Sequence, residues 1–86
     1  MSTPRYTDIR KHELNERVGQ RISHYRELSG LSQSQLAEEI GASRASVSKI
    51  EAGQLPCSLH MITSISEVLD VTLDDLVEVF VRESAE

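Results

Sequence analysis

Several residue types are scarce in this chain of 86 residues, and each scarcity argues against a class of protein. The single cysteine, Cys57, excludes an internal disulfide and a cysteine-based zinc cluster. We interpret it as a small, semi-buried apolar residue rather than a redox group. No apolar run reaches the roughly 18 residues of a membrane span, and the N-terminal residues have no signal-peptide apolar region. We therefore expect a soluble, cytoplasmic protein with no membrane partner.

Motifs for catalysis are also missing. No serine has a recognisable base as its partner, and no glycine-rich phosphate loop occurs. The three histidines, His12, His24 and His60, lack metal-ligand spacing with one another or with Cys57. We therefore expect no enzyme activity, no cofactor and no metal. Aromatic residues make up only 3% of the chain, so Leu, Ile, Val and Ala must build the core of one small domain.

The charge is acidic overall but divided unevenly. The formal net charge is -5, whereas a nucleic-acid binder is usually basic. Residues 1–54 carry eight Lys and Arg against seven Asp and Glu, a net charge of +1. Residues 55–86 carry one basic residue, Arg82, and seven acidic ones, a net charge of -6. This polarity is compatible with one part that faces DNA and an acidic part turned away from it.

Apolar residues recur at helical spacing along nearly the whole chain, and no stretch alternates as a half-buried strand does. We expect five short helices around one aliphatic core. The first runs from about residue 8 to Ser29 and ends at Gly30. Its apolar stripe consists of Leu14, Val18, Ile22 and Tyr25.

Each later helix begins at a serine or threonine that can cap it. In chain order these caps are Ser32, Ser43, Ser58 and Thr72. Ser32 and Thr72 are each followed three residues later by a capping-box partner, Gln35 and Asp75. The residues expected to face the core from these helices are Leu36, Ala37, Ile40, Val47, Ile50, Leu59, Ile62, Ile65, Leu69, Leu73, Leu76, Val77 and Phe80.

The stretch from Ser32 to Gly53 is the most informative. Its two helices are joined by the very short turn Gly41-Ala42, which sets them at a steep angle, as in a DNA-binding helix-turn-helix. Gly41 supplies the positive φ that so tight a reversal needs. The second of these helices faces inward with Val47 and Ile50. Its outward residues are Arg44, Ala45, Ser48 and Lys49, with Ser43 and Ser46 near its start.

At this point the sequence resembles the Cro/CI-type helix-turn-helix family, also called the XRE family. The residues that carry the resemblance are Val18-Gly-Gln-Arg-Ile22, Arg26, Leu31-Ser-Gln33, Leu36-Ala37, Gly41, Ser43, Val47-Ser-Lys-Ile-Glu51, Gly53, Pro56 and Asp70-Val-Thr-Leu-Asp-Asp-Leu76. They run through roughly two-thirds of the chain, in the order and at the spacing of the family. The resemblance implies an all-α, compact five-helix, lambda-repressor-like domain that binds double-stranded DNA.

The resemblance also implies a role for individual residues. Gln33 and Ser43 would contact the phosphate backbone, and Arg44, Ala45 and Lys49 would reach base edges in the major groove. The side-chain chemistry agrees, because Arg44 can donate a forked pair to guanine and Ala45 can touch a thymine methyl group. Lys49 can either read guanine or bind phosphate. The full set expected to face DNA is Gln33, Ser43, Arg44, Ala45, Ser46, Ser48 and Lys49.

Two further features qualify this assignment. Glu51 would repel phosphate, and the resemblance points instead to a structural ion pair with Arg26 that ties the third helix to the first. Ala52 stands where many relatives have a phosphate-binding asparagine, and the loop at Gln54-Leu55 has no basic residue. Fewer phosphate contacts predict weaker and less salt-sensitive binding per subunit.

The two ends of the chain each allow two interpretations. Val79 and Val81 flank the apolar stripe of the last helix, and we favour a dimer interface over a cover for the core. A two-fold dimer through the last two helices would set the two DNA-reading helices about 34 Å apart. The segment 1–12, which contains Arg5, Arg10 and Lys11, is either an arm or helix extension that touches phosphates or a frayed terminus.

We therefore divide the chain into an N-terminal arm or helix extension (1–12) and a helix-turn-helix domain (13–83), with its core at 32–53 and its last two helices at 58–83. We expect a homodimeric repressor or autoregulator that binds a palindromic operator through the helix at 43–52. One alternative is an antitoxin that also holds a toxin with its acidic C-terminal part. The other is a protein-interaction module that does not bind DNA.

Overall fold

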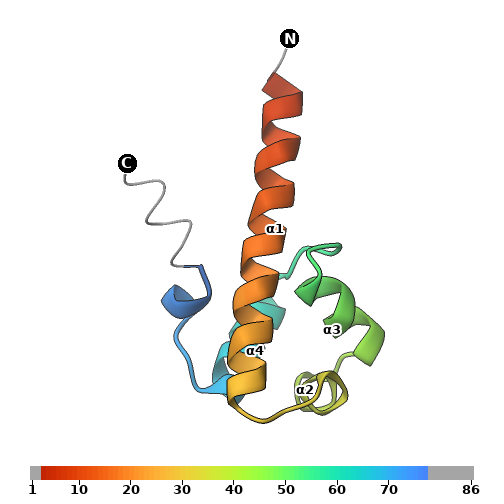
Figure 1. Cartoon of the computed structure of the whole chain (residues 1–86), viewed down its shortest axis with the longest axis vertical. Helices are drawn as coiled ribbons and strands as arrows, with labels where there is room; N and C mark the ends of the chain where they lie inside the picture. Colours follow the sequence, from red (N-terminus) through yellow and green to blue (C-terminus); the bar gives the residue numbers. More distant parts are fainter. Residues whose placement is uncertain (1–2, 78–86) are drawn as a thin grey trace.

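The computed structural model describes residues 3–77, with side chains from Lys11 onward. Within this range the helices are α1 (Thr3–Leu28), α2 (Gln33–Ile40), α3 (Arg44–Glu51) and α4 (Leu59–Leu69), and residues 73–77 form a further helical segment. Figure 1 shows α1 as a long rod, with α2 and α3 on one side of its C-terminal half and the segment 73–77 on the other. The predicted all-helical fold class is confirmed.

The predicted caps begin the helices where they were expected. Ser32 forms a complete capping box, in which its hydroxyl oxygen accepts from the N–H of Gln35 (3.0 Å) and the Gln35 side chain accepts from the N–H of Ser32 (2.8 Å). Ser43 and Ser58 accept from backbone N–H groups three residues further on. Gly41 ends α2 at φ 72° and ψ 31°, a left-handed conformation in which a Cβ would be strained. These local bonds set the helix-turn-helix register.

The core is aliphatic, as the shortage of aromatic residues requires. Its fully buried members come from α1, α2, α3, α4 and the segment 73–77, so one core joins all five elements. The largest side chains with less than 2% exposure are Ile22, Leu36, Ile65, Leu76 and Val47. Ala37, on α2, is 3% exposed, in keeping with a small residue where two helices meet.

The structure differs from the sequence-based expectation at four places, one of which is Leu14, expected in the apolar stripe of the first helix but 36% exposed. α1 begins at Thr3 rather than near residue 8, and Pro4 lies in its first turn, where proline is tolerated because those N–H groups have no helical partner. Leu59 was expected in the core but is 75% exposed, because it lies in the first turn of α4 at the edge of the apolar stripe. Leu73 was also expected to face inward and is 40% exposed.

Gly19 permits a very close approach between α1 and the end of α3. A Cβ built on Gly19 would lie 2.3 Å from the carbonyl oxygen of Ile50 and 2.7 Å from that of Glu51. Both neighbours are backbone atoms, so a rotamer change cannot relieve the clash. The absence of a side chain at this position therefore sets the distance between the two helices.

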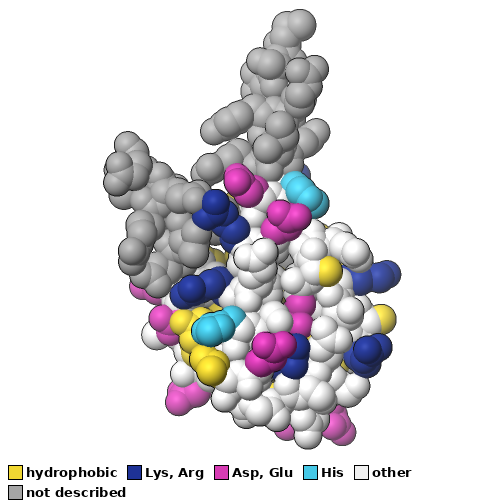
Figure 2. Space-filling model, in the orientation of Figure 1, with side chains coloured by type: hydrophobic (Ala, Val, Ile, Leu, Met, Phe, Trp, Pro, Cys, Tyr) yellow, Lys and Arg dark blue, Asp and Glu magenta, His cyan; other side chains and the backbone are white. Residues whose placement is uncertain are grey.

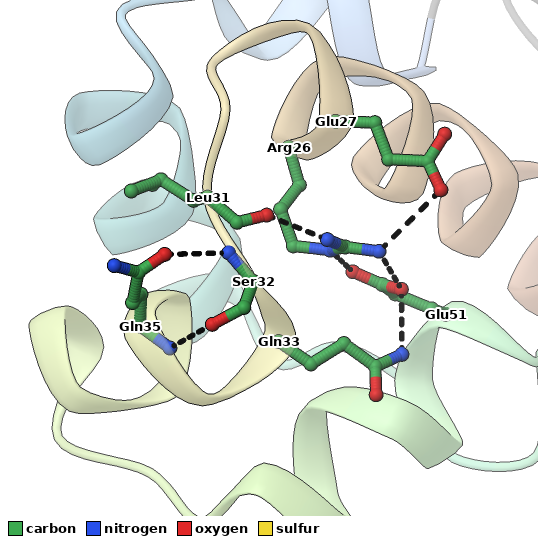
Figure 3. A network of polar contacts seen from close by, with 7 residues as sticks. All are labelled: Arg26, Glu27, Leu31, Ser32, Gln33, Gln35 and Glu51. Atoms are coloured by element: carbon green, nitrogen blue, oxygen red, sulfur yellow. Dashed lines mark hydrogen bonds and ion pairs between the residues drawn. The ribbon is translucent and has the colours of Figure 1, made fainter.

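A buried ion pair lies across the same contact (Figure 3). The Arg26 guanidinium donates to Glu51 through Nε–Oε2 (2.6 Å) and Nη2–Oε1 (3.2 Å), and the two side chains are 10% and 6% exposed. Its Nη1 donates to the carbonyl oxygen of Leu31 at 2.7 Å, in the turn that leads to α2. Arg26 thus joins the end of α1, the start of α2 and the end of α3.

We predict that Gly19→Ala lowers the free energy of unfolding by about 2 kcal/mol, because overpacking against backbone outweighs the better helix propensity of alanine. Urea unfolding measures the change. Gln20→Ala, at the exposed neighbouring position on α1, serves as the control and should change stability by less than about 0.5 kcal/mol. Equal stability of the two variants would contradict the close approach of α1 and α3.

We predict that Arg26→Met lowers the free energy of unfolding by about 3–5 kcal/mol, because it leaves the Glu51 carboxylate buried without its partner. The double variant Arg26→Met/Glu51→Met should lose less than Arg26→Met alone, since it buries no unpaired charge. His12→Ala, which breaks an exposed pair with Glu16 (3.2 Å), is the control and should cost under about 1 kcal/mol. A double variant that is less stable than Arg26→Met would refute this account.

Candidate nucleic-acid interface

α3 has one anchored face and one free face. Val47 and Ile50 point into the core with 2% and 4% exposure. Arg44, Ala45 and Lys49 are all exposed to solvent. Because the inward face is rigidly packed, the outward side chains are presented from a fixed helix, which is the arrangement that major-groove readout requires.

The first turn of α3 is stabilised by its own serines. The Ser43 hydroxyl oxygen accepts from the N–H of Ser46 at 3.0 Å and its hydroxyl donates to Ser46 Oγ at 3.0 Å. Ser43 is exposed, whereas Ser46 and Ser48 are half-buried. Of the serines expected to face DNA, Ser43 is therefore the most accessible, and its side chain also has a structural role as the cap.

Gln33 is the first residue of α2 and is half-buried. Its side-chain Nε2 donates to Glu51 Oε1 at 2.9 Å, so the amide reaches across to the end of α3 (Figure 3). The expected pair of Glu51 with Arg26 is confirmed, whereas the bond from Gln33 to Glu51 was not predicted from the sequence. The two residues are 18 positions apart, and no local spacing indicates such a contact.

The charge around this face is mixed. Figure 2 shows Lys and Arg side chains at the right-hand edge of the molecule, on the side where Figure 1 places α3. Arg44 and Lys49 supply exposed positive charge on α3. Glu38 and Glu39 are exposed in the last turn of α2. The positive charge therefore lies on the helix that carries the candidate base-reading residues.

Other chemistry receives little support from the described residues. Burial raises the pKa of the Cys57 thiol from 9.0 to about 11, so the reactive thiolate is scarce at neutral pH. Cys57 lines a small, mostly apolar depression of about 220 Å³ between α1, α4 and the loop after α3. Between residues 11 and 77, where side chains are described, no three potential metal ligands lie together, and none of the helices from Thr3 onward has the apolar length of a membrane span.

The two predicted dimer residues, Val79 and Val81, lie outside the described residues. The described residues do include the start of the last helix. There the N–H of Thr72 donates to Asp75 Oδ2 at 3.0 Å and the N–H of Asp75 donates to Thr72 Oγ1 at 3.1 Å, which is the expected reciprocal cap. Arg21 Nε donates to the carbonyl oxygen of Asp75 at 2.8 Å and thereby fastens this segment to α1.

Known proteins are similar to this chain in sequence and in fold. The transcriptional regulator SinR of Bacillus subtilis is 39% identical over 62 residues, which are 71% of this chain and 56% of SinR. The chain therefore matches only about half the length of that relative. The crystal structure of the restriction-modification controller protein C.AhdI from Aeromonas hydrophila superposes with a TM-score of 0.69 at 35% identity, covering 72% of this chain and 94% of C.AhdI.

A second solved structure is the complex of SinR protein with SinI protein. Its matching chain superposes with a TM-score of 0.66 at 32% identity, and the match covers 79% of this chain and 78% of the matching chain. The helix-turn-helix family model HTH_3 matches residues 22–76, which include α2, the turn and α3. The chain belongs to this helix-turn-helix family.

Proposed function

We propose that this protein is a sequence-specific DNA-binding transcriptional regulator. The observation that carries the proposal is the free outward face of α3, where Arg44, Ala45 and Lys49 are exposed on a helix whose other face is buried. Arg44 would read guanine, Ala45 would meet a thymine methyl group, and Lys49 would read guanine or hold a phosphate. The relatives, which are named as regulators, support action by binding rather than by catalysis.

The phosphate backbone would be held from both sides of the turn. Gln33 lies in the first turn of α2, where N–H groups without a helical partner and the helix dipole favour an anion. Ser43 and Ser46 lie in the cap and first turn of α3, Ser48 lies half a turn further on, and all three would line the same backbone. Contacts of this kind set the register of α3 in the groove but carry no base preference.

We further propose that the protein acts in the cytoplasm as a homodimeric repressor on a two-fold symmetric operator. Val79 and Val81 would join the two copies, and residues 1–12 would form an arm or helix extension ahead of the domain at 13–83. In support, Arg21 and the cap at Thr72 fasten the start of the last helix, where the dimer contact would begin. Occupation of the operator would then depend on the protein concentration through the dimer equilibrium.

A second candidate adds a protein partner to DNA binding. The acidic part of the chain, residues 55–86 with a net charge of -6, could hold a basic or apolar partner, as in an antitoxin. SinR, a relative of this chain, has been solved in complex with the protein SinI. The mass of the protein purified from its native host distinguishes the candidates, because a bound toxin or inhibitor would add to the mass of the homodimer.

We predict that Arg44→Ala weakens binding to a duplex enriched from a random-sequence pool by the wild-type protein. The loss should be about 1–3 kcal/mol for each bidentate contact with guanine. Discrimination at that base pair should disappear, because the contact that distinguishes the base is gone. Fluorescence anisotropy with the selected duplex and with single-base variants measures both effects.

Lys11→Ala is the matched control, because Lys11 is an exposed cation on α1 outside the helix-turn-helix. It should leave base preference unchanged and can only reduce overall affinity and its salt dependence. If Arg44→Ala lowered affinity equally for every sequence, Arg44 would be a phosphate contact. If no duplex were enriched by the wild-type protein, the proposal of sequence-specific binding would be wrong.

A further inference from the structure

The carboxylate of Glu51 contacts both a cation and an amide. Its Oε1 accepts from Arg26 Nη2 at 3.2 Å and from Gln33 Nε2 at 2.9 Å, while its Oε2 accepts from Arg26 Nε at 2.6 Å. The ion pair alone explains why Glu51 is tolerated at 6% exposure. It does not explain why the carboxylate also holds a glutamine from α2.

We infer that Glu51 is a positioning residue that fixes which end of the Gln33 amide is presented to a DNA phosphate. This inference rests on the proposed DNA binding and adds a role for a residue that does not itself touch DNA. A carboxylate can only accept hydrogen bonds, so it selects the orientation in which the NH₂ end of Gln33 faces it. The opposite orientation would place the amide oxygen against the carboxylate with no hydrogen between them.

The selected orientation suits a phosphate. A side-chain NH₂ group carries two hydrogens, and the bond to Glu51 uses one of them. A phosphate oxygen also only accepts, so it needs the second hydrogen of the same group. Without the constraint from Glu51, the amide could equally flip and place its oxygen where the NH₂ group now lies, and a phosphate beside that position would then be repelled.

Arg26 makes this arrangement electrostatically acceptable. A bare carboxylate one amide away from a phosphate would oppose DNA binding through like-charge repulsion. The guanidinium engages both oxygens of Glu51 and is itself held by the Leu31 carbonyl oxygen at 2.7 Å. Arg26 Nη2 also lies 3.7 Å from the exposed Glu27 carboxylate, but both hydrogen bonds of the guanidinium to a carboxylate go to Glu51. Glu51 can therefore accept from Gln33 while its charge is paired.

The position of Gln33 is restricted from the other side as well. It directly follows the cap Ser32, and the capping box with Gln35 fixes the backbone of this first turn. Backbone and amide are thus both held before DNA arrives. Such preorganisation strengthens binding because less side-chain freedom is lost in the complex.

A double-mutant cycle on DNA affinity tests the inference, with the duplex enriched by the wild-type protein as the probe. In the wild-type background, Gln33→Ala should weaken binding about tenfold, as expected for a hydrogen bond to a charged group. In the Glu51→Gln background, Gln33→Ala should weaken DNA binding by less than about twofold. A glutamine at position 51 has both a donor and an acceptor, so it no longer selects one end of the Gln33 amide.

Glu38→Gln is the matched control, because it removes the same charge from an exposed position on α2. In the Glu38→Gln background, Gln33→Ala should still weaken DNA binding about tenfold. A tenfold cost in the Glu51→Gln background as well would show that Glu51 acts only on stability, and the inference would be overturned while DNA binding stands. If the wild-type protein enriches no duplex, the proposed function and this role both fail.

A measurement on the unmodified protein covers the case in which Glu51→Gln does not fold. In an NMR spectrum of the free wild-type protein, the two side-chain NH₂ protons of Gln33 should be widely separated, with one shifted by its bond to Glu51. The NH₂ group of Gln54, an exposed residue, provides the reference for a free amide. Coincidence of the Gln33 signals with those of Gln54 would overturn the inference.

Discussion

The buried ion pair between Arg26 and Glu51 constrains the rest of the structure, because a charge with so little exposure must keep its partner within hydrogen-bond distance. Arg26 lies at the end of α1 and Glu51 at the end of α3, so the pair sets the position of one helix against the other. Gly19 favours the same crossing of α1 and α3, because its missing side chain lets the carbonyl groups at the end of α3 come close to the α1 backbone. The helix that carries the candidate DNA-reading residues is therefore held by a charge pair and by close backbone contact at once.

This rigidity has a functional meaning. Arg44, Ala45 and Lys49 are useful for reading bases only if the helix beneath them does not rotate, and Val47 and Ile50 prevent rotation by filling the core. The short turn at Gly41 then fixes α3 relative to α2, whose first residue is the candidate phosphate contact Gln33. Through Glu51, the amide of Gln33 is linked to the same ion pair that holds α3. In the proposed function, base reading and backbone contact would thus be coupled by one small polar network.

The sequence predicted the fold and the outward face of α3, and the family resemblance predicted the pair of Arg26 with Glu51, but the other contacts between helices were not foreseen. Capping residues such as Ser32 and Ser43 act on backbone groups three positions away, so their effect can be read from spacing alone. Leu59 was misplaced because periodicity gives the angle of a side chain around its helix but not whether a neighbour covers that turn. The bond between Gln33 and Glu51 had no sequence signal, because the two residues are 18 positions apart and meet only through the packing of α2 against α3.

The amino-acid sequence by itself therefore determined the helices, their caps, the tight turn and the apolar stripes, all of which depend on interactions within a few residues and on the helical period. The tertiary structure alone decided how near α1 comes to α3 at Gly19, how deeply the ion pair is buried, and which way the Gln33 amide points. These features join residues from different helices. Their distances depend on how the helices cross, and that crossing results from the packing of the whole core rather than from any local pattern.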